Sequence, residues 1–269
     1  MTLLDRQPTG RYKSITKTFT LSDARTVLVA ARGAASVSEA FELSIPRLTQ
    51  GTHRRRRDVV RSVLRHLLGC EDGLLPWNAL VDLLADSGVP PYAASPLFGL
   101  LYCAHTPLAR LLVAQLYLAP MDEAAAGPTP IAPNELRAWL ADHLEECSPN
   151  VLANTCSTML MMLRKFGYIG DAQALSMSER CVSPALFAGA VVLDYRSQGW
   201  STRSLDYVTS SQGPRALLML PKAEAVLCFE QAVGRGLLTR ITVAGETDVG
   251  LPRGDTLTRV AEEVRCDLV

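Results

Sequence analysis

Apolar and polar positions along the chain follow a helical spacing over most of its length. The clearest helix is expected between Thr52, a capping residue, and Gly69, a residue that ends helices. Its apolar positions recur every three or four residues and make one face: Val59, Val60, Val63, Leu64 and Leu67. The pattern therefore predicts a helix that is buried along one side and polar along the other.

Similar patterns predict a mainly helical protein. Further helices are expected at 22–32, 36–46, 76–86, 92–105, 107–118, 133–146, 150–166, 184–198, 221–233 and 256–264. Residues 202–210 are expected to form a short helix or turn. The β-branched segment 237–245 predicts a strand, and 246–255 is turn-like.

The order of these elements predicts the domain organisation. Residues 1–20 form an arm, 21–118 a helical domain that contains the basic helix, 119–132 a linker rich in Pro, Ala and Gly, and 133–269 a C-terminal helical part. Within 133–182 the order is helix, turn, helix and a short wing, which is typical of a winged helix-turn-helix. A second such unit is possible at the C-terminus. The expected fold class is mainly α, with winged helix-turn-helix-like elements and small β-hairpin wings.

Charge adds a feature that the composition hides. The formal net charge is zero, with 27 Lys and Arg against 27 Asp and Glu. Residues 1–70 hold 13 basic and 5 acidic residues, whereas 71–150 hold 2 basic and 10 acidic residues. The basic lobe suits phosphate, an acidic partner, or the acidic lobe of a neighbouring copy.

The arginine-rich helix is the first candidate site. The sequence HRRRRDVVRSVLRHLL places guanidinium groups away from the apolar face: Arg54, Arg55, Arg57, Arg61 and Arg65. Such a face attracts phosphate, and the planar guanidinium suits paired contacts to it. Three interpretations stay open, which are nucleic acid, an acidic protein surface within or outside the chain, and plain exposure to solvent.

The predicted helix 150–166 is the second candidate site. It offers short polar side chains and a basic end: Asn150, Asn154, Thr155, Ser157, Thr158, Arg164 and Lys165. These groups can donate to phosphates or base edges if the helix enters a groove. The acidic residues of the preceding helix oppose close approach of DNA on that side.

Other function classes find little support. The chain contains no HExxH, GxGxxG, P-loop or GxSxG motif, and no Cys/His pair has zinc spacing. We therefore expect no enzyme activity, no metal and no cofactor, although an enzyme with an unfamiliar site stays open. Seven Cys without a CxxC pair predict a reducing compartment. The polar N-terminus and the interrupted apolar stretch 96–120 predict a cytoplasmic protein without a membrane span.

The succession of helices resembles a known family. The segments that carry the resemblance are THRRRRDVVRSVLRHLL, ASPLFGLLYCAHTPLARLLVAQLYLA, ELRAWLADHLEECSPNVLANTCSTMLMMLRKFGYIG and VSPALFAGAV, within about residues 20 to 200. The chain resembles BrxA-like core components of BREX bacteriophage-exclusion systems. The resemblance implies a mainly helical protein with helix-turn-helix elements that binds double-stranded DNA and works beside a methyltransferase and other defence proteins.

Two functions follow as hypotheses. The first is a non-enzymatic DNA-binding accessory protein of a phage-defence system, in which the basic helix holds phosphates and helix 150–166 lies in or beside a groove. The second is a protein adaptor of a multiprotein defence complex without direct DNA contact, in which the oppositely charged lobes dock onto partners.

Overall fold

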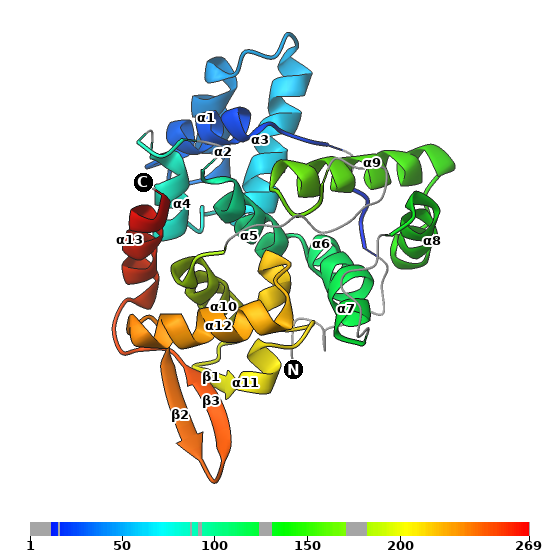
Figure 1. The fold of residues 1–269 in the computed structure, drawn as a ribbon. Coiled ribbons are helices and arrows are strands. Elements are labelled where there is room, and N and C mark those ends of the chain that lie inside the picture. The colour runs from blue at the N-terminus through cyan, green and yellow to red at the C-terminus, as the bar shows by residue number, and fades with distance from the viewer. Residues whose placement is uncertain are drawn as a thin grey trace.

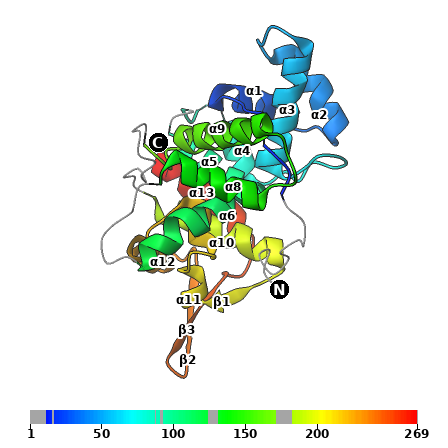
Figure 2. The same ribbon diagram turned by 90° about the vertical axis from the view of Figure 1, so that its right-hand side faces the viewer.

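The computed structural model describes residues 12–15, 17–86, 88–90, 93–123, 131–170 and 182–268. These residues form a mainly helical body with one three-stranded antiparallel sheet, which confirms the predicted fold class (Figure 1). Helices α1 to α3 lie at one end of the body. The hairpin of β2 and β3 projects from the opposite end, as Figure 2 also shows.

The elements lie close to the helices expected from the apolar pattern. The first half of the chain contains α1 (Leu21–Ala31), α2 (Val37–Ser44), η1 (Ile45–Arg47), α3 (His53–Leu68), α4 (Ala79–Ala85), α5 (Ser95–His105), α6 (Pro107–Leu112), η2 (Val113–Leu118) and α7 (Ala119–Glu123). The second half contains α8 (Pro133–His143), α9 (Pro149–Lys165), α10 (Pro184–Gln198), β1 (Thr202–Ser204), α11 (Leu205–Val208), η3 (Pro214–Leu218), α12 (Lys222–Gly234), β2 (Thr239–Val243), β3 (Glu246–Gly250) and α13 (Thr256–Leu268).

Helix α3 begins and ends as its sequence predicts. The Thr52 hydroxyl accepts a hydrogen bond from the Arg55 backbone N–H, and Gly69 ends the helix with φ of 68°. The predicted apolar face is buried against α1, α2 and α5. Because that face is fully covered by the protein, the arginines must lie toward the outside.

The predicted linker 119–132 begins as a helix. Residues 107–123 form one helical run, in which η2 is a π-helical stretch between α6 and α7. Asp122 of α7 pairs with the buried Arg215 of η3, which holds this run against the C-terminal half. Residues 124–130 lie outside the described residues. The domain boundary itself stays a prediction, although one hydrophobic core includes residues from both sides of it.

The sheet corrects two predictions near the C-terminus. Residues 246–250 were expected to be turn-like but form β3, which pairs with β2 on one side and β1 on the other. The turn lies earlier, at Ala244 and Gly245, whose φ values of 52° and 88° suit a tight hairpin. Strand β1 likewise occupies part of the segment expected to be a short helix or turn.

The two wings predicted from sequence have different outcomes. The first depends on residues 171–181, which lie outside the described residues. The second is present, because α10, β1, α11, η3 and α12 are followed by the β2–β3 hairpin with strand order β1-β3-β2. This succession of helices, strands and hairpin is a winged-helix arrangement, with α12 in the place of the recognition helix.

The apolar stretch 96–120 is built into the core, since most of its side chains are buried. Among the helices of the described ranges, none alone is long and apolar enough to cross a membrane. The pair formed by Ser95–His105 and Pro107–Glu123 would be long and apolar enough together, but it is bent by 102°.

Candidate nucleic-acid interface

The outer side of α3 carries a ridge of basic side chains. His53, Arg57, Arg61 and Arg65 follow one another at intervals of four residues and therefore share one face of the helix. Arg54, Arg57 and Arg61 are exposed, and none of the three has an ion-pair or hydrogen-bond partner for its side chain among the residues that the structure describes. Arg54 lies three residues before Arg57 and so borders the same face, and the ridge including Arg54 thus keeps three unpaired guanidinium groups at the surface.

The other two predicted arginines are held by the protein itself. Arg65 is partly buried, and its Nε lies 2.9 Å from Oε1 of Glu71. Arg55 is partly buried and donates a hydrogen bond of 3.0 Å to the Thr18 carbonyl oxygen. Both side chains are committed to internal contacts, so their availability to an outside anion is lower than that of the exposed three.

Residues 17–20 bring α3 and the end of α9 together. Lys165 of α9 donates a hydrogen bond of 3.0 Å to the Phe19 carbonyl oxygen, next to the Thr18 oxygen that Arg55 binds. Burial lowers the pKa of Lys165, and the positive charge of Arg55 lowers it further, whereas Asp23 raises it. Two residues predicted in separate sites therefore lie in one basic cluster.

Helix α9 presents only part of its predicted polar set. Asn150 and Asn154 are exposed near its N-terminus, at the end that adjoins α8 and lies away from α3 (Figure 1). Thr155 and Thr158 are only 0% and 5% exposed, so the prediction that they contact DNA is wrong. Arg164 is partly buried and donates to the Gly170 carbonyl oxygen over 3.4 Å.

The burial of Thr155 yields a direct test. Its Oγ1 is buried and has no hydrogen-bond partner within the described part of the chain. We expect Thr155→Val to leave affinity for DNA unchanged and to raise the free energy of unfolding by about 1 kcal/mol, because an unsatisfied buried hydroxyl is removed. Urea titration and a DNA-binding titration measure the two effects. A clear loss of DNA affinity in the folded variant would show that Thr155 contributes to DNA binding after all.

A groove with two hollows follows the ridge of α3. The larger hollow has a volume of about 760 Å³ and lies between α2, α3 and the segment after α3. The smaller has a volume of about 290 Å³ and is lined by Lys13, Arg65, His66 and His105, among others. Glu71 lines both hollows, so the two adjoin at the Arg65–Glu71 ion pair.

The smaller hollow has a buried imidazole in its wall. His66 Nδ1 lies 2.9 Å from Oγ1 of Thr106, and the side chain packs on the ring of Tyr102. Burial, with a smaller contribution from Arg65, lowers the pKa of His66 to about 4. His105 lies in the same wall, and burial lowers its pKa as well. This end of the groove is therefore neutral near pH 7 apart from Lys13 and the ion pair.

His66 predicts a dependence of stability on pH. The unfolded chain takes up this proton near pH 6.5, whereas the folded chain does so only near pH 4. Stability should therefore fall as pH falls from about 6.5 to about 4, by up to about 1.4 kcal/mol per pH unit from this group. Denaturant titrations at several pH values should give a shallower slope for His66→Gln than for the wild type. The same titrations on His53→Gln, which replaces an exposed imidazole at the start of α3, serve as the control.

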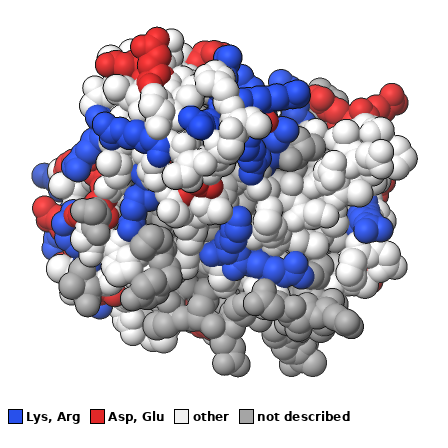
Figure 3. Space-filling model, turned by 90° about the horizontal axis from the view of Figure 1, so that it is seen from above, with Lys and Arg blue, Asp and Glu red and all other residues white. Residues whose placement is uncertain are grey.

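The surface charges agree with this placement of the groove. Seen from the end formed by α1 to α3, Lys and Arg side chains form several groups across the face, and most of the visible Asp and Glu side chains lie toward its edges (Figure 3). Because most of the carboxylates lie away from these cations, they neutralise the positive potential of this face only in part.

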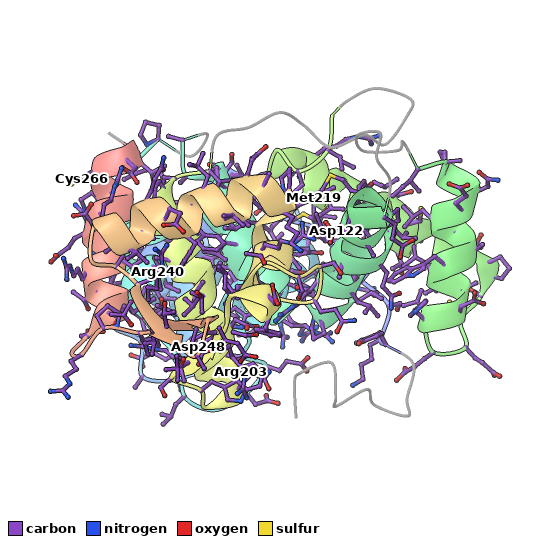
Figure 4. The ribbon with its side chains drawn as sticks, turned by 60° about the horizontal axis from the view of Figure 1, so that its bottom comes forward. Asp122, Arg203, Met219, Arg240, Asp248 and Cys266 are labelled. Atoms are coloured by element: carbon purple, nitrogen blue, oxygen red, sulfur yellow. The ribbon has the colours of Figure 1, made fainter. Side chains whose placement is uncertain are left out.

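The winged-helix unit at the opposite end has a different character. Three large apolar side chains are exposed there, namely Leu227 of α12 at 57%, Ile241 at 44% and Val243 of β2 at 68%. Arg240 is paired with Glu230 of α12, and the Arg203 guanidinium stacks 3.5 Å from the ring centre of Trp200. Arg203, Arg240 and Asp248 mark this end in Figure 4. Arg203 and Arg240 are therefore engaged locally, unlike Arg54, Arg57 and Arg61 of α3.

The described ranges contain no group of three or more His, Cys, Asp or Glu side chains placed to hold a metal ion. Sequence reasoning missed both hollows of the α3 groove and the exposed apolar side chains of the winged unit. Their sequence signal is weak, because each feature joins residues from separate segments. Only for Ile241 and Val243 could the local pattern have predicted a shared face, because they lie two residues apart in a predicted strand.

No protein-family model and no curated protein matches the chain. Solved structures with the same fold include a magnesium-ion-bound crystal structure of SspB, with a TM-score of 0.63 and 13% identity over 96% of this chain and 87% of that chain. A second SspB crystal structure gives a TM-score of 0.61 and 12% identity with the same coverage. These comparisons do not show the BrxA-like resemblance, which stays a prediction. At these identities the likeness to SspB shows a shared fold.

Proposed function

We propose that this protein is a DNA-binding accessory protein of a phage-defence system and that α3 holds the backbone of double-stranded DNA. The observation that carries the proposal is the set of exposed guanidinium groups at Arg54, Arg57 and Arg61, which lack partners in the described chain. Arginine forks on one helix face suit successive phosphates, and each contact releases condensed counterions. Lys165 and Arg55 form the flank of this surface.

The assignment to phage defence has two supports. The helix order resembles BrxA-like components of BREX systems, which implies work beside a methyltransferase and other defence proteins. SspB, whose fold is shared, is a phage-defence-related protein of the phosphorothioation system. The proposed partners are double-stranded DNA and the other proteins of such a system.

A salt titration with duplexes of random sequence tests the proposal. Plotting the logarithm of the association constant against that of the salt concentration gives a slope of about −0.9 for each phosphate contacted. With three free arginines we expect a slope of about −3 or steeper, and the same slope for unrelated sequences. Binding that is absent at low salt, or that does not respond to salt, would contradict the proposal.

A specific observation supports an adaptor as the second candidate. The winged unit exposes Leu227, Ile241 and Val243, and α12 carries two carboxylates on its outside, Glu224 and Glu230. Because Glu230 is paired with Arg240 and Lys222 is exposed on the same helix, the adaptor is supported by the exposed apolar side chains, which suit a protein partner. Purification of the protein from its native cells would distinguish the two. A stoichiometric partner that covers the α3 arginines, together with no retention on heparin, would favour an adaptor without DNA contact.

A further inference from the structure

The larger hollow beside α3 combines cationic, acidic and apolar side chains. A site for phosphate alone needs no carboxylates, and an apolar groove needs no charges. Its lining carries cations from α3, carboxylates from α2 and the segment after α3, and apolar side chains from α2 and η1. We propose that it receives one unpaired nucleotide of the DNA bound along α3, with a base that carries an exocyclic amino group. This inference rests on the proposed function and names the chemistry of the same surface.

The α3 wall supplies the phosphate contacts. His53, Arg57 and Arg61 are placed four residues apart, and all three line the hollow. Arg57 and Arg61 have no ion-pair partner in the described segments. A 5′-phosphate at this wall would continue the row of phosphates along the ridge, so the nucleotide enters without leaving the backbone path.

The apolar part of the lining suits a base. Phe41 of α2 is partly exposed and lines the hollow together with Ile45 and Pro46. Aromatic side chains stack on bases of any sequence, and neighbouring apolar groups exclude water from the ring faces. The volume of about 760 Å³ falls within the usual range of small-ligand sites and accommodates a whole nucleotide.

The carboxylates select the kind of base. Glu71 is already paired with Arg65, but Glu42 and Asp72 are exposed and have no ion-pair partner in the described chain. Both line the hollow, where they would repel a second phosphate and accept hydrogen bonds from an amino group. Cytosine, adenine and guanine carry such a group and thymine does not, so the site should disfavour thymine.

Fluorescence anisotropy with bulged duplexes tests the proposal. One duplex carries a single unpaired dC, a second carries an unpaired dT at the same place, and a third is fully paired. We expect the dC bulge to bind about tenfold more tightly than the dT bulge and the paired duplex. Equal affinity of the wild type for all three duplexes would overturn the proposal.

Variants locate the preference in the hollow. Phe41→Ala should weaken binding of the dC bulge by about five- to tenfold, down to the affinity of the paired duplex, and leave the paired duplex unchanged. Phe41→Leu removes the aromatic ring but keeps apolar bulk, so it tests stacking in a variant that is expected to fold. Leu43→Ala is the matched control, because Leu43 is exposed on the same helix and does not line the hollow. Glu42→Ala with Asp72→Ala should abolish the difference between dC and dT, because neither side chain then accepts a hydrogen bond. An unchanged preference in both sets of variants would place the nucleotide elsewhere.

Further arms separate this proposal from the proposed function. Salt-dependent binding of paired duplex without any dC preference would refute the hollow and leave the function intact. Isothermal titration with dCMP, dTMP and inorganic phosphate distinguishes a free mononucleotide from a nucleotide of DNA. If dCMP binds and no duplex does, the hollow is a mononucleotide site and DNA binding fails. If dCMP binds no more tightly than phosphate while the dC bulge is preferred, the backbone path supplies the remaining affinity.

Discussion

Replacing Asp194 by alanine is expected to lower the free energy of unfolding by about 3–5 kcal/mol. Asp194 of α10 is 2% exposed, and its Oδ1 lies 2.7 Å from Nη1 of the buried Arg110 of α6. The Tyr207 hydroxyl donates a hydrogen bond of 2.9 Å to its Oδ2. Removal of the carboxylate leaves a guanidinium buried without its counter-charge, and that cost exceeds the value of the pair itself.

Chemical denaturation measures the effect, with a matched pair of controls. Asp206→Ala removes an exposed carboxylate from nearby α11 and should change stability by no more than about 0.5 kcal/mol. Arg110→Met combined with Asp194→Leu removes both charges and should recover most of the loss. A loss below about 1 kcal/mol for Asp194→Ala would show that water compensates Arg110, contrary to the burial in the structure.

The same network explains how the halves of the chain are joined. Arg110 also donates a hydrogen bond of 2.9 Å to the Gln212 carbonyl oxygen, so one side chain joins α6, α10 and the segment before η3. Burial raises the pKa of Tyr207, and the charge of Asp194 raises it further, so the phenol stays protonated as a donor. These contacts cross the boundary predicted at 119–132, and they fix the winged unit against the body that carries α3.

Local signals made much of the fold predictable. Thr52 and Gly69 bound α3 as expected, because capping and left-handed termination depend on single residues. Pro184 and Gln198 bound α10 for similar reasons, since proline suits the first helical turn and Gly199 takes a positive φ. The exposure of Arg54, Arg57 and Arg61 also followed from the position of the apolar face.

Features that depend on distant partners were not predictable. Asp194 lies near the polar end of a helix and reads as a surface residue, since nothing local indicates that Arg110 will meet it. The two hollows depend on how α2 and the segment after α3 pack, which the sequence does not encode locally. Thr155 and Thr158 were taken for surface donors, although they fall on the side of Leu152, Met159 and Leu163 at helical spacing. The helical spacing of these two residues therefore indicated burial, but their polar residue type favoured a surface position.

Replacing Arg54, Arg57 and Arg61 together by alanine is expected to weaken binding of duplex DNA by about a hundredfold near 0.1 M salt. The loss should be similar for all sequences, because phosphate contacts carry no base information. The slope of log affinity against log salt should become shallower by about 2.7, since three phosphate contacts disappear. Anisotropy titrations from low to high salt measure both quantities in the same experiment.

The controls separate a phosphate-binding ridge from a general effect of charge. Lys222, Arg253 and Arg259 are exposed on the winged unit and on α13, away from α3, and their replacement by alanine removes the same formal charge. That variant should keep the wild-type slope and most of the affinity. At physiological salt, ions screen the interaction between exposed charges that lie more than about 8–10 Å apart. Equal losses in the two triple variants would show that DNA responds to net charge alone, and the α3 ridge would then have no special role. Lysine at positions 54, 57 and 61 should restore the slope but not the full affinity, because an ammonium retains the charge without the paired contacts of a guanidinium.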